Sequence, residues 1–149
     1  MADWRVFARY PDARMFFRDV RMKTRLAREY RFVIDNGPQP HGGGGHAGIS
    51  DPTAARAIFM LTTDARERER AQRKLDSCEK LIAVGWRAVR AIDAGLGGRS
   101  ARAVKLHYLD DRSIREVAET MGASAATVKR DVGIALDWLD SQKVSEIFG

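Results

Sequence analysis

Apolar residues recur three or four positions apart along most of the chain, which is the spacing of one face of an α-helix. The first such stripe predicts a helix that begins near Pro11 and stops before Asn36. Its members are Met15, Val20, Met22, Leu26, Tyr30 and Val33. Aromatic residues outside the stripe, such as Phe16 and Phe17, must also be covered, either by the rest of the chain or by another subunit.

Residues 36–50 contain four successive glycines and are predicted to form a flexible linker or hairpin loop. A second, longer helix is predicted after them. Ser50 or Asp51 fits its N-cap and Pro52 fits its first turn. Apolar residues then recur at helical intervals until a glycine-rich hinge at residues 95–98. Such a long helix cannot bury its stripe against a small module alone. We therefore expect it to fold back on the first helix as a coiled-coil-like hairpin, or to pair with another subunit.

The stretch from Leu106 to Leu139 predicts two capped helices joined by a tight turn. Ser113 fits the first N-cap with Glu116 as its capping-box partner, and Gly122 fits the C-cap. Ser124 fits the N-cap of the next helix, whose apolar residues are Val128, Val132, Ala135, Leu136 and Leu139. This pattern is typical of a helix-turn-helix, in which the second helix enters the major groove of DNA. Because no strand pattern occurs anywhere, we predict an all-α fold.

The face of the second helix opposite its apolar residues is the predicted DNA-reading surface. Small side chains let a helix approach base edges, while hydroxyl and basic groups can bind them. The residues predicted to face the bases are Ala125, Ala126, Thr127, Lys129 and Arg130. Those predicted to contact the DNA backbone are Arg102, Lys105, Arg112, Ser113, Arg115 and Ser124. The alternative is a helical hairpin that only packs, in which the caps serve stability.

The same stretch resembles region 4 of bacterial sigma-70-family factors, especially the small extracytoplasmic-function type. The matching residues are Leu106, Tyr108, Ser113, Glu116, Val117, Ala118, Gly122, Thr127, Val128, Lys129, Ala135, Leu136 and Leu139. No preceding stretch resembles the sigma regions that melt DNA, so the resemblance implies a sigma-like module rather than a complete sigma factor. In size, organisation and the DPTA element at residues 51–54, the whole chain is similar to phage and prophage late-transcription activators of the RinA and ArpU type.

The positive charge is unevenly distributed. A formal net charge of +6 favours a polyanionic partner, yet residues 99–149 carry eight basic and eight acidic residues. A module without net charge should bind DNA weakly by itself, so dimerisation or RNA polymerase would have to supply the remaining affinity. Residues 1–35 carry nine basic and five acidic residues and offer another source of phosphate contacts. The arginines that would make these contacts recur at helical spacing, at Arg14, Arg18, Arg21, Arg25 and Arg28. The alternative is that they form only a solvated helix face.

The sequence contains no clear pattern of a catalytic, metal or cofactor site. The carboxylates lie beside basic residues on amphipathic helices, which is ordinary surface chemistry. His41, His46 and His107 have no Cys or Ser partner at an informative spacing, and Cys78 is the only cysteine. We therefore expect no enzyme, metal or cofactor. With no apolar run of transmembrane length and no secretory signal, we expect a cytoplasmic protein that does not bind membranes.

These patterns combine into one organisation and one function. We predict a helical hairpin for dimerisation or interaction at residues 1–94, a helix-turn-helix at residues 99–140 and a tail at residues 141–149. The predicted function is sequence-specific transcription regulation of phage or prophage type, with a recognition helix at about residues 125–139. Double-stranded DNA is the predicted partner, RNA polymerase a candidate one, and a homo-oligomer, favouring a dimer, is expected. The alternatives are a DNA-packaging protein resembling a small terminase subunit, and a sigma-like polymerase adaptor with weak intrinsic DNA binding.

Overall fold

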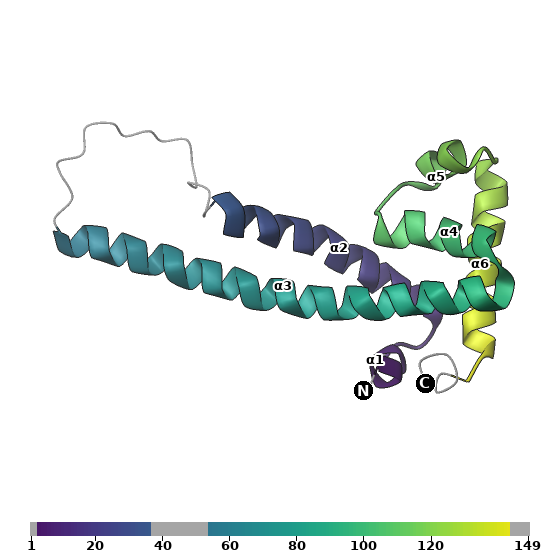
Figure 1. Cartoon of the computed structure of the whole chain (residues 1–149), viewed down its shortest axis with the longest axis horizontal. Coiled ribbons are helices and arrows are strands. Elements are labelled where there is room, and N and C mark those ends of the chain that lie inside the picture. Colours follow the sequence, from purple (N-terminus) through teal and green to yellow (C-terminus); the bar gives the residue numbers. More distant parts are fainter. Residues whose placement is uncertain (1–2, 37–53, 144–149) are drawn as a thin grey trace. The chain divides into compact units, whose positions relative to one another are not determined.

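The computed structural model describes residues 3–36 and 54–143, and within these ranges it is helical and contains no strand (Figure 1). The prediction of an all-α fold is thus confirmed. In chain order the elements are α1 (Asp3–Phe7), α2 (Ala13–Asn36), α3 (Ala54–Leu96), α4 (Gly98–Val104), the π-helical η1 (Lys105–Leu109), α5 (Ile114–Met121) and α6 (Ala125–Ser141). The chain divides into two compact units, the first formed by residues 1–25 and 78–149 and the second by residues 26–77.

The predicted helix ends are largely those of the structure. At the start of α2, the Met15 N–H donates to Asp12 Oδ1 at 2.8 Å, so Asp12 caps the helix. The glycine-rich linker predicted at residues 36–50 lies outside the described residues except for Asn36, and so do the predicted cap residues before α3. Helix α3 is a single helix that ends at Leu96, within the predicted glycine cluster.

The predicted hinge at residues 95–98 lies inside the first unit rather than between units. A Cβ atom added at Gly95 would overlap the indole ring of Trp138, so glycine allows α3 to approach α6 closely here. The helix-turn-helix is consequently packed together with the end of α3 and the start of α2. The predicted division between residues 94 and 99 does not coincide with the division into the two units.

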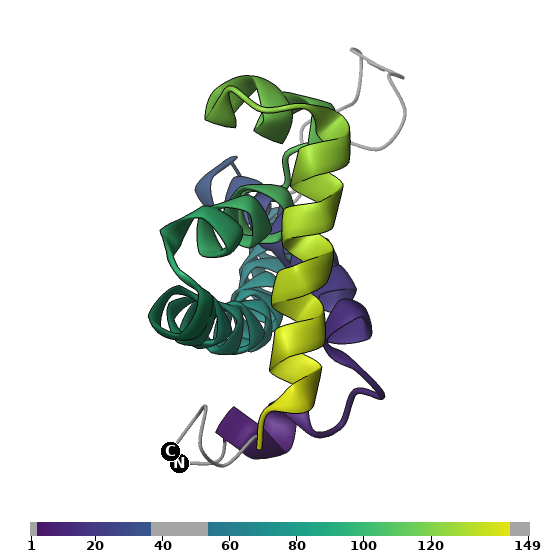
Figure 2. The ribbon, with the colours of Figure 1, turned by 90° about the vertical axis from the view of Figure 1, so that its right-hand side faces the viewer.

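The core of the first unit joins α2 and α3 to the helices that follow. Phe16, Phe17 and Ile92 are fully buried, and the rings of Phe17 and Tyr108 lie 5.4 Å apart between centroids. A Cβ at Gly85 of α3 would lie 3.1 Å from a Val20 methyl group of α2, so these two helices pack closely. Figure 2 looks onto α6, which contacts both α4 and α5.

The buried face of α2 differs from the predicted stripe. Met15 and Met22 were predicted to be core residues, yet 44% and 57% of their surfaces are exposed. Of the predicted stripe, α2 fully buries Val20; the other residues that it buries are Ala13, Phe16, Phe17, Thr24 and Ala27. Because each phenyl ring offers a large apolar surface, the rotation that buries both phenylalanines removes more of it from water than the predicted rotation.

The second unit comprises the end of α2 and the first part of α3. Its described buried residues are small or aliphatic, namely Ala27, Ala71 and Leu75. The Lys74 ammonium lies 5.8 Å from the ring centroid of Tyr30, which places α2 beside α3 in this unit too. Most of the charged run from Arg66 to Lys74 is exposed. Helices α2 and α3 therefore contact each other within each unit, while the predicted role of this region in dimerisation stays a prediction.

Candidate nucleic-acid interface

Local signals define both helices of the helix-turn-helix. Ser113 Oγ accepts the Glu116 N–H at 3.1 Å and lies 3.2 Å from Glu116 Oε1. Gly122 adopts the left-handed conformation (φ 63°, ψ 36°) that ends α5, and the Ala123 N–H returns to the Ala118 carbonyl at 3.0 Å. Ser124 Oγ accepts the Thr127 N–H at 3.1 Å at the start of α6. The predicted caps and turn are confirmed.

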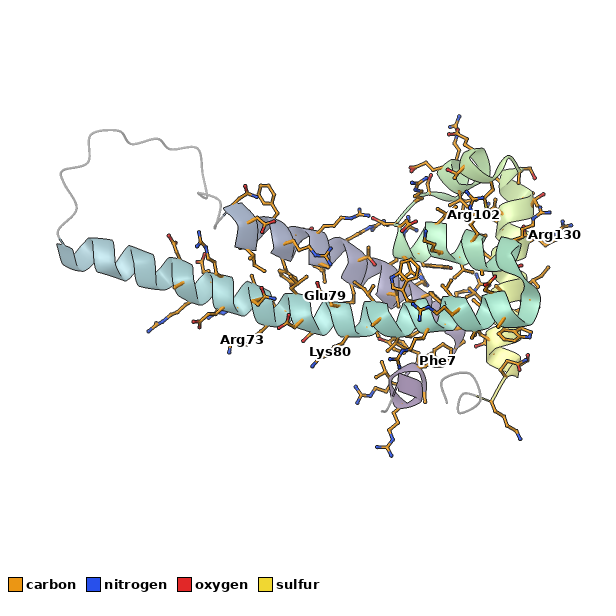
Figure 3. All side chains as sticks on the ribbon, in the orientation of Figure 1. Phe7, Arg73, Glu79, Lys80, Arg102 and Arg130 are labelled. Carbon is orange, nitrogen blue, oxygen red and sulfur yellow. The ribbon has the colours of Figure 1, made fainter. Side chains whose placement is uncertain are left out.

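Helix α6 is oriented as its apolar spacing predicts. All of its predicted core residues are buried, namely Val128, Val132, Ala135, Leu136 and Leu139. Ala125, Ala126, Lys129 and Arg130 are exposed, and Arg130 projects away from the ribbon (Figure 3). A Cβ at Gly133, one turn further along this face, would meet no neighbouring atom. The first half of α6 thus presents a small and basic surface, whose contact with DNA stays a prediction.

Two polar residues of α6 are engaged with the protein itself. Thr127 is half-buried and its Oγ1 lies 2.8 Å from Ser124 Oγ, so this predicted base-facing hydroxyl takes part in the cap. Asp131 is buried, and Arg99 Nε donates to its Oδ2 at 2.9 Å. A buried carboxylate needs such a partner, and this ion pair joins α4 to α6. No local sequence pattern predicts this ion pair, since the two residues are distant in the chain.

The predicted backbone-contact residues fall into two groups. Arg102 is exposed beside the turn at Met121 and Gly122, and Arg115 keeps 90% of its side chain exposed at the start of α5. Arg112 is also exposed, with Nη1 donating to Thr120 Oγ1 at 3.1 Å. These three lie on the helix-turn-helix elements or beside them.

Lys105 is directed elsewhere, and the two serines have structural roles. The Lys105 ammonium lies 3.6 Å from Asp110 Oδ2 and 5.6 Å from the Trp86 ring centroid, so it lies against α3. The hydroxyls of Ser113 and Ser124 are used as caps. The backbone N–H groups of the first turns of α5 and α6 still provide positively polarised ends that suit a phosphate.

An ion-pair cluster ties α2 to the segment that leads into α5. Asp111, at φ 55°, accepts Arg21 Nε at 2.6 Å and Arg25 Nε at 2.9 Å. Partial burial opposes ionisation of Asp111, but the bonds and charges of the two guanidinium groups outweigh it and lower the pKa of this carboxyl. The sequence contains no local signal for this cluster, because the aspartate lies about ninety positions after its partners.

His107 lies beside this cluster. Its Nδ1 is 2.7 Å from the Arg112 carbonyl oxygen and its Nε2 is 3.5 Å from Arg21 Nη1. Burial lowers the pKa of His107 below its ordinary value, although the bond to the Arg112 carbonyl acts in the opposite direction. His107 therefore connects α2, η1 and the approach to α5 as a neutral side chain near pH 7.

The helix-turn-helix lies within a stretch that matches a known family. Residues 94–138 match the family model Sigma-70, region 4. The match runs from the end of α3 to Trp138 in α6 and covers less than a third of the chain. No curated protein and no solved structure matches the chain. The sigma region 4 match indicates DNA binding and a role related to transcription.

Among the described residues, no group of three or more His, Cys, Asp and Glu side chains could hold a metal ion. None of the helices in the described ranges has the length and apolar character needed to cross a bilayer. His41 and His46 lie outside the described residues.

Proposed function

We propose that the protein is a sequence-specific transcription regulator of phage or prophage type, in which α6 reads the major groove. One observation carries the proposal: within the stretch that matches sigma region 4, the capped α5–α6 pair exposes a small and basic face at the start of α6. The resemblance of the whole chain to RinA- and ArpU-type activators supports the phage context. A homodimer is proposed as the binding species, since paired half-sites would add affinity to a module with little net charge.

The charge along the outer face of α6 favours its first half as the reading surface. Ala125 and Ala126 leave room for base edges, and the next turn carries Lys129 and Arg130. Among the described residues, neither of these two basic side chains has an ion-pair partner, so both are available for DNA. The second half carries the exposed Asp137, which would repel phosphates. We infer that the N-terminal half of α6 enters the major groove of the DNA.

The first experiment is affinity purification of genomic fragments on the purified full-length chain, with and without RNA polymerase, followed by sequencing. Enrichment of a promoter-proximal site by the protein alone supports the proposal and supplies the operator. Enrichment that needs polymerase supports instead the sigma-like adaptor, which the balanced charge of residues 99–149 favours. Absence of enrichment in both arms contradicts both functions and points to DNA packaging.

Substitutions at the reading surface then test the assigned residues. Lys129→Ala and Arg130→Ala should each weaken binding to the enriched site by ~1–3 kcal/mol and relax its sequence preference at one position. Arg73→Ala removes an exposed positive charge from α3 in the second unit and serves as the control (Figure 3). Equal weakening on every sequence would show that Lys129 and Arg130 contact phosphates rather than bases.

A further inference from the structure

A basic groove lies in the first unit, apart from the exposed face of α6. Four arginines of α2 lie together on one side of the helix, next to its buried face, and with Met22, His107 and Tyr108 they line an open groove of about 530 Å³. These arginines are Arg14, Arg18, Arg21 and Arg25. Pockets for small molecules are usually lined by apolar side chains. Four guanidinium groups along one groove select for an anion, and for phosphate or carboxylate in particular.

The four arginines differ in their availability. Asp111 binds both Arg21 and Arg25, so one carboxylate holds two guanidinium groups in place and neutralises only one of them. Arg14 and Arg18 are exposed, and neither has an ion-pair partner among the described residues. The groove therefore combines two available arginines with a fixed pair that keeps one excess positive charge.

We propose that this groove binds the phosphate backbone of the DNA duplex that α6 reads, an inference that rests on the proposed function. The charge distribution supports it. Residues 1–25 carry seven basic and three acidic residues, whereas residues 99–149 carry eight of each. Both segments belong to the first unit, so the start of α2 supplies the charge that the helix-turn-helix lacks.

The groove also adjoins the predicted DNA-binding elements. Asp111 precedes the exposed Arg112 and the cap of α5, so the pairs that fix Arg21 and Arg25 also fix the approach to that helix. The start of α5 is itself a place where backbone phosphates are bound in helix-turn-helix proteins. An acidic protein segment would match the charge equally well. The continuity between groove and helix-turn-helix favours DNA.

The test compares two charge-matched double variants of the full-length chain. R14Q/R18Q removes the available arginines of the groove, and K80Q/R90Q removes two exposed basic residues of α3 in the same unit. Affinities for the enriched site and for a scrambled duplex are measured by fluorescence anisotropy over a range of salt concentrations. Thermal unfolding of each variant confirms that it is folded.

Loss of two phosphate contacts should lower the salt slope of R14Q/R18Q by about 2 on both duplexes. Between about 50 and 200 mM salt, the wild-type protein should then lose roughly tenfold more affinity than R14Q/R18Q. The ratio of affinities for the two duplexes should stay unchanged. R14K/R18K should keep the wild-type slope, because lysine supplies the same charge.

The outcomes separate this inference from the proposed function. If R14Q/R18Q and K80Q/R90Q have the same slope on the enriched site, the groove does not bind that DNA and an acidic protein segment becomes its assigned occupant. If the wild-type protein binds both duplexes equally and R14Q/R18Q still lowers the slope, sequence-specific reading by α6 is wrong while the groove inference stands.

Discussion

Helices α6 and α2 both contribute to the core of the first unit, yet only α6 buries the face that its sequence predicts. The large apolar residues of α6 lie mainly on one side, so a single rotation buries them and leaves Ile134 48% exposed. Helix α2 carries large apolar residues around much of its circumference. Its rotation is set by its neighbours, since Phe16 lies 4.8 Å from Phe7 and Phe17 lies 5.4 Å from Tyr108, measured between ring centroids. Helical spacing thus determines a face only where one apolar stripe exists.

The largest expected effect comes from placing a charge on each predicted face. Leu136→Asp should destabilise the protein by more than about 3 kcal/mol, because Leu136 is 1% exposed and the new carboxylate would be buried without a partner. Met22→Asp, on the predicted but incorrect face of α2, should cost less than about 1 kcal/mol. Urea unfolding followed by circular dichroism measures both. Losses of similar size would show that α2 buries the methionine face after all.

The structural features that the sequence predicts best are those with local determinants. The caps at Ser113 and Ser124 and the left-handed Gly122 follow from residues three or four positions apart, so the helix-turn-helix could be predicted almost completely. The exposed side of α6 followed from its apolar spacing. The pairs that Asp111 and Asp131 form depend on residues distant in the chain, and no spacing rule reveals them.

Two glycines sharpen the contrast between a packed and an open helix surface. Gly95→Ala should destabilise the protein by about 1–3 kcal/mol, since the added methyl group would overlap the Trp138 ring and force α3 away from α6. Gly133→Ala, on the open face of α6, should stabilise it by up to about 1 kcal/mol through helix propensity. Urea midpoints of the two variants give both values. Effects of the same sign would contradict the close approach of α3 to α6.

Caps should matter equally in α5, whose N-cap was predicted, and in α2, whose buried face was not. Ser113→Ala removes the acceptor of the Glu116 N–H, and Asp12→Ala removes the acceptor of the Met15 N–H. Each should cost about 1 kcal/mol in the free energy of unfolding. Ser113→Asp and Asp12→Ser, which keep a capping oxygen, serve as controls and should retain most of the stability. A negligible loss for Asp12→Ala alone would mean that tertiary packing, rather than the local cap, determines where α2 begins.

The smallest expected effect is a dependence on pH at His107, where α2 meets the approach to α5. Burial and the nearby charge of Arg21 lower its pKa in the folded protein, so as the pH falls below about 6.5 the unfolded chain takes up a proton first. The stability linked to neutral His107 is therefore complete above that pH and is lost towards the lower folded pKa. Asp111 does not titrate in this window, because its own pKa is lowered. When the pH is lowered from about 7.5 to about 5.5, the urea midpoint of unfolding should fall more for the wild-type protein than for His107→Gln. An identical fall in both would show that His107 titrates alike in the folded and unfolded chains, and that its bond to Arg112 balances its burial.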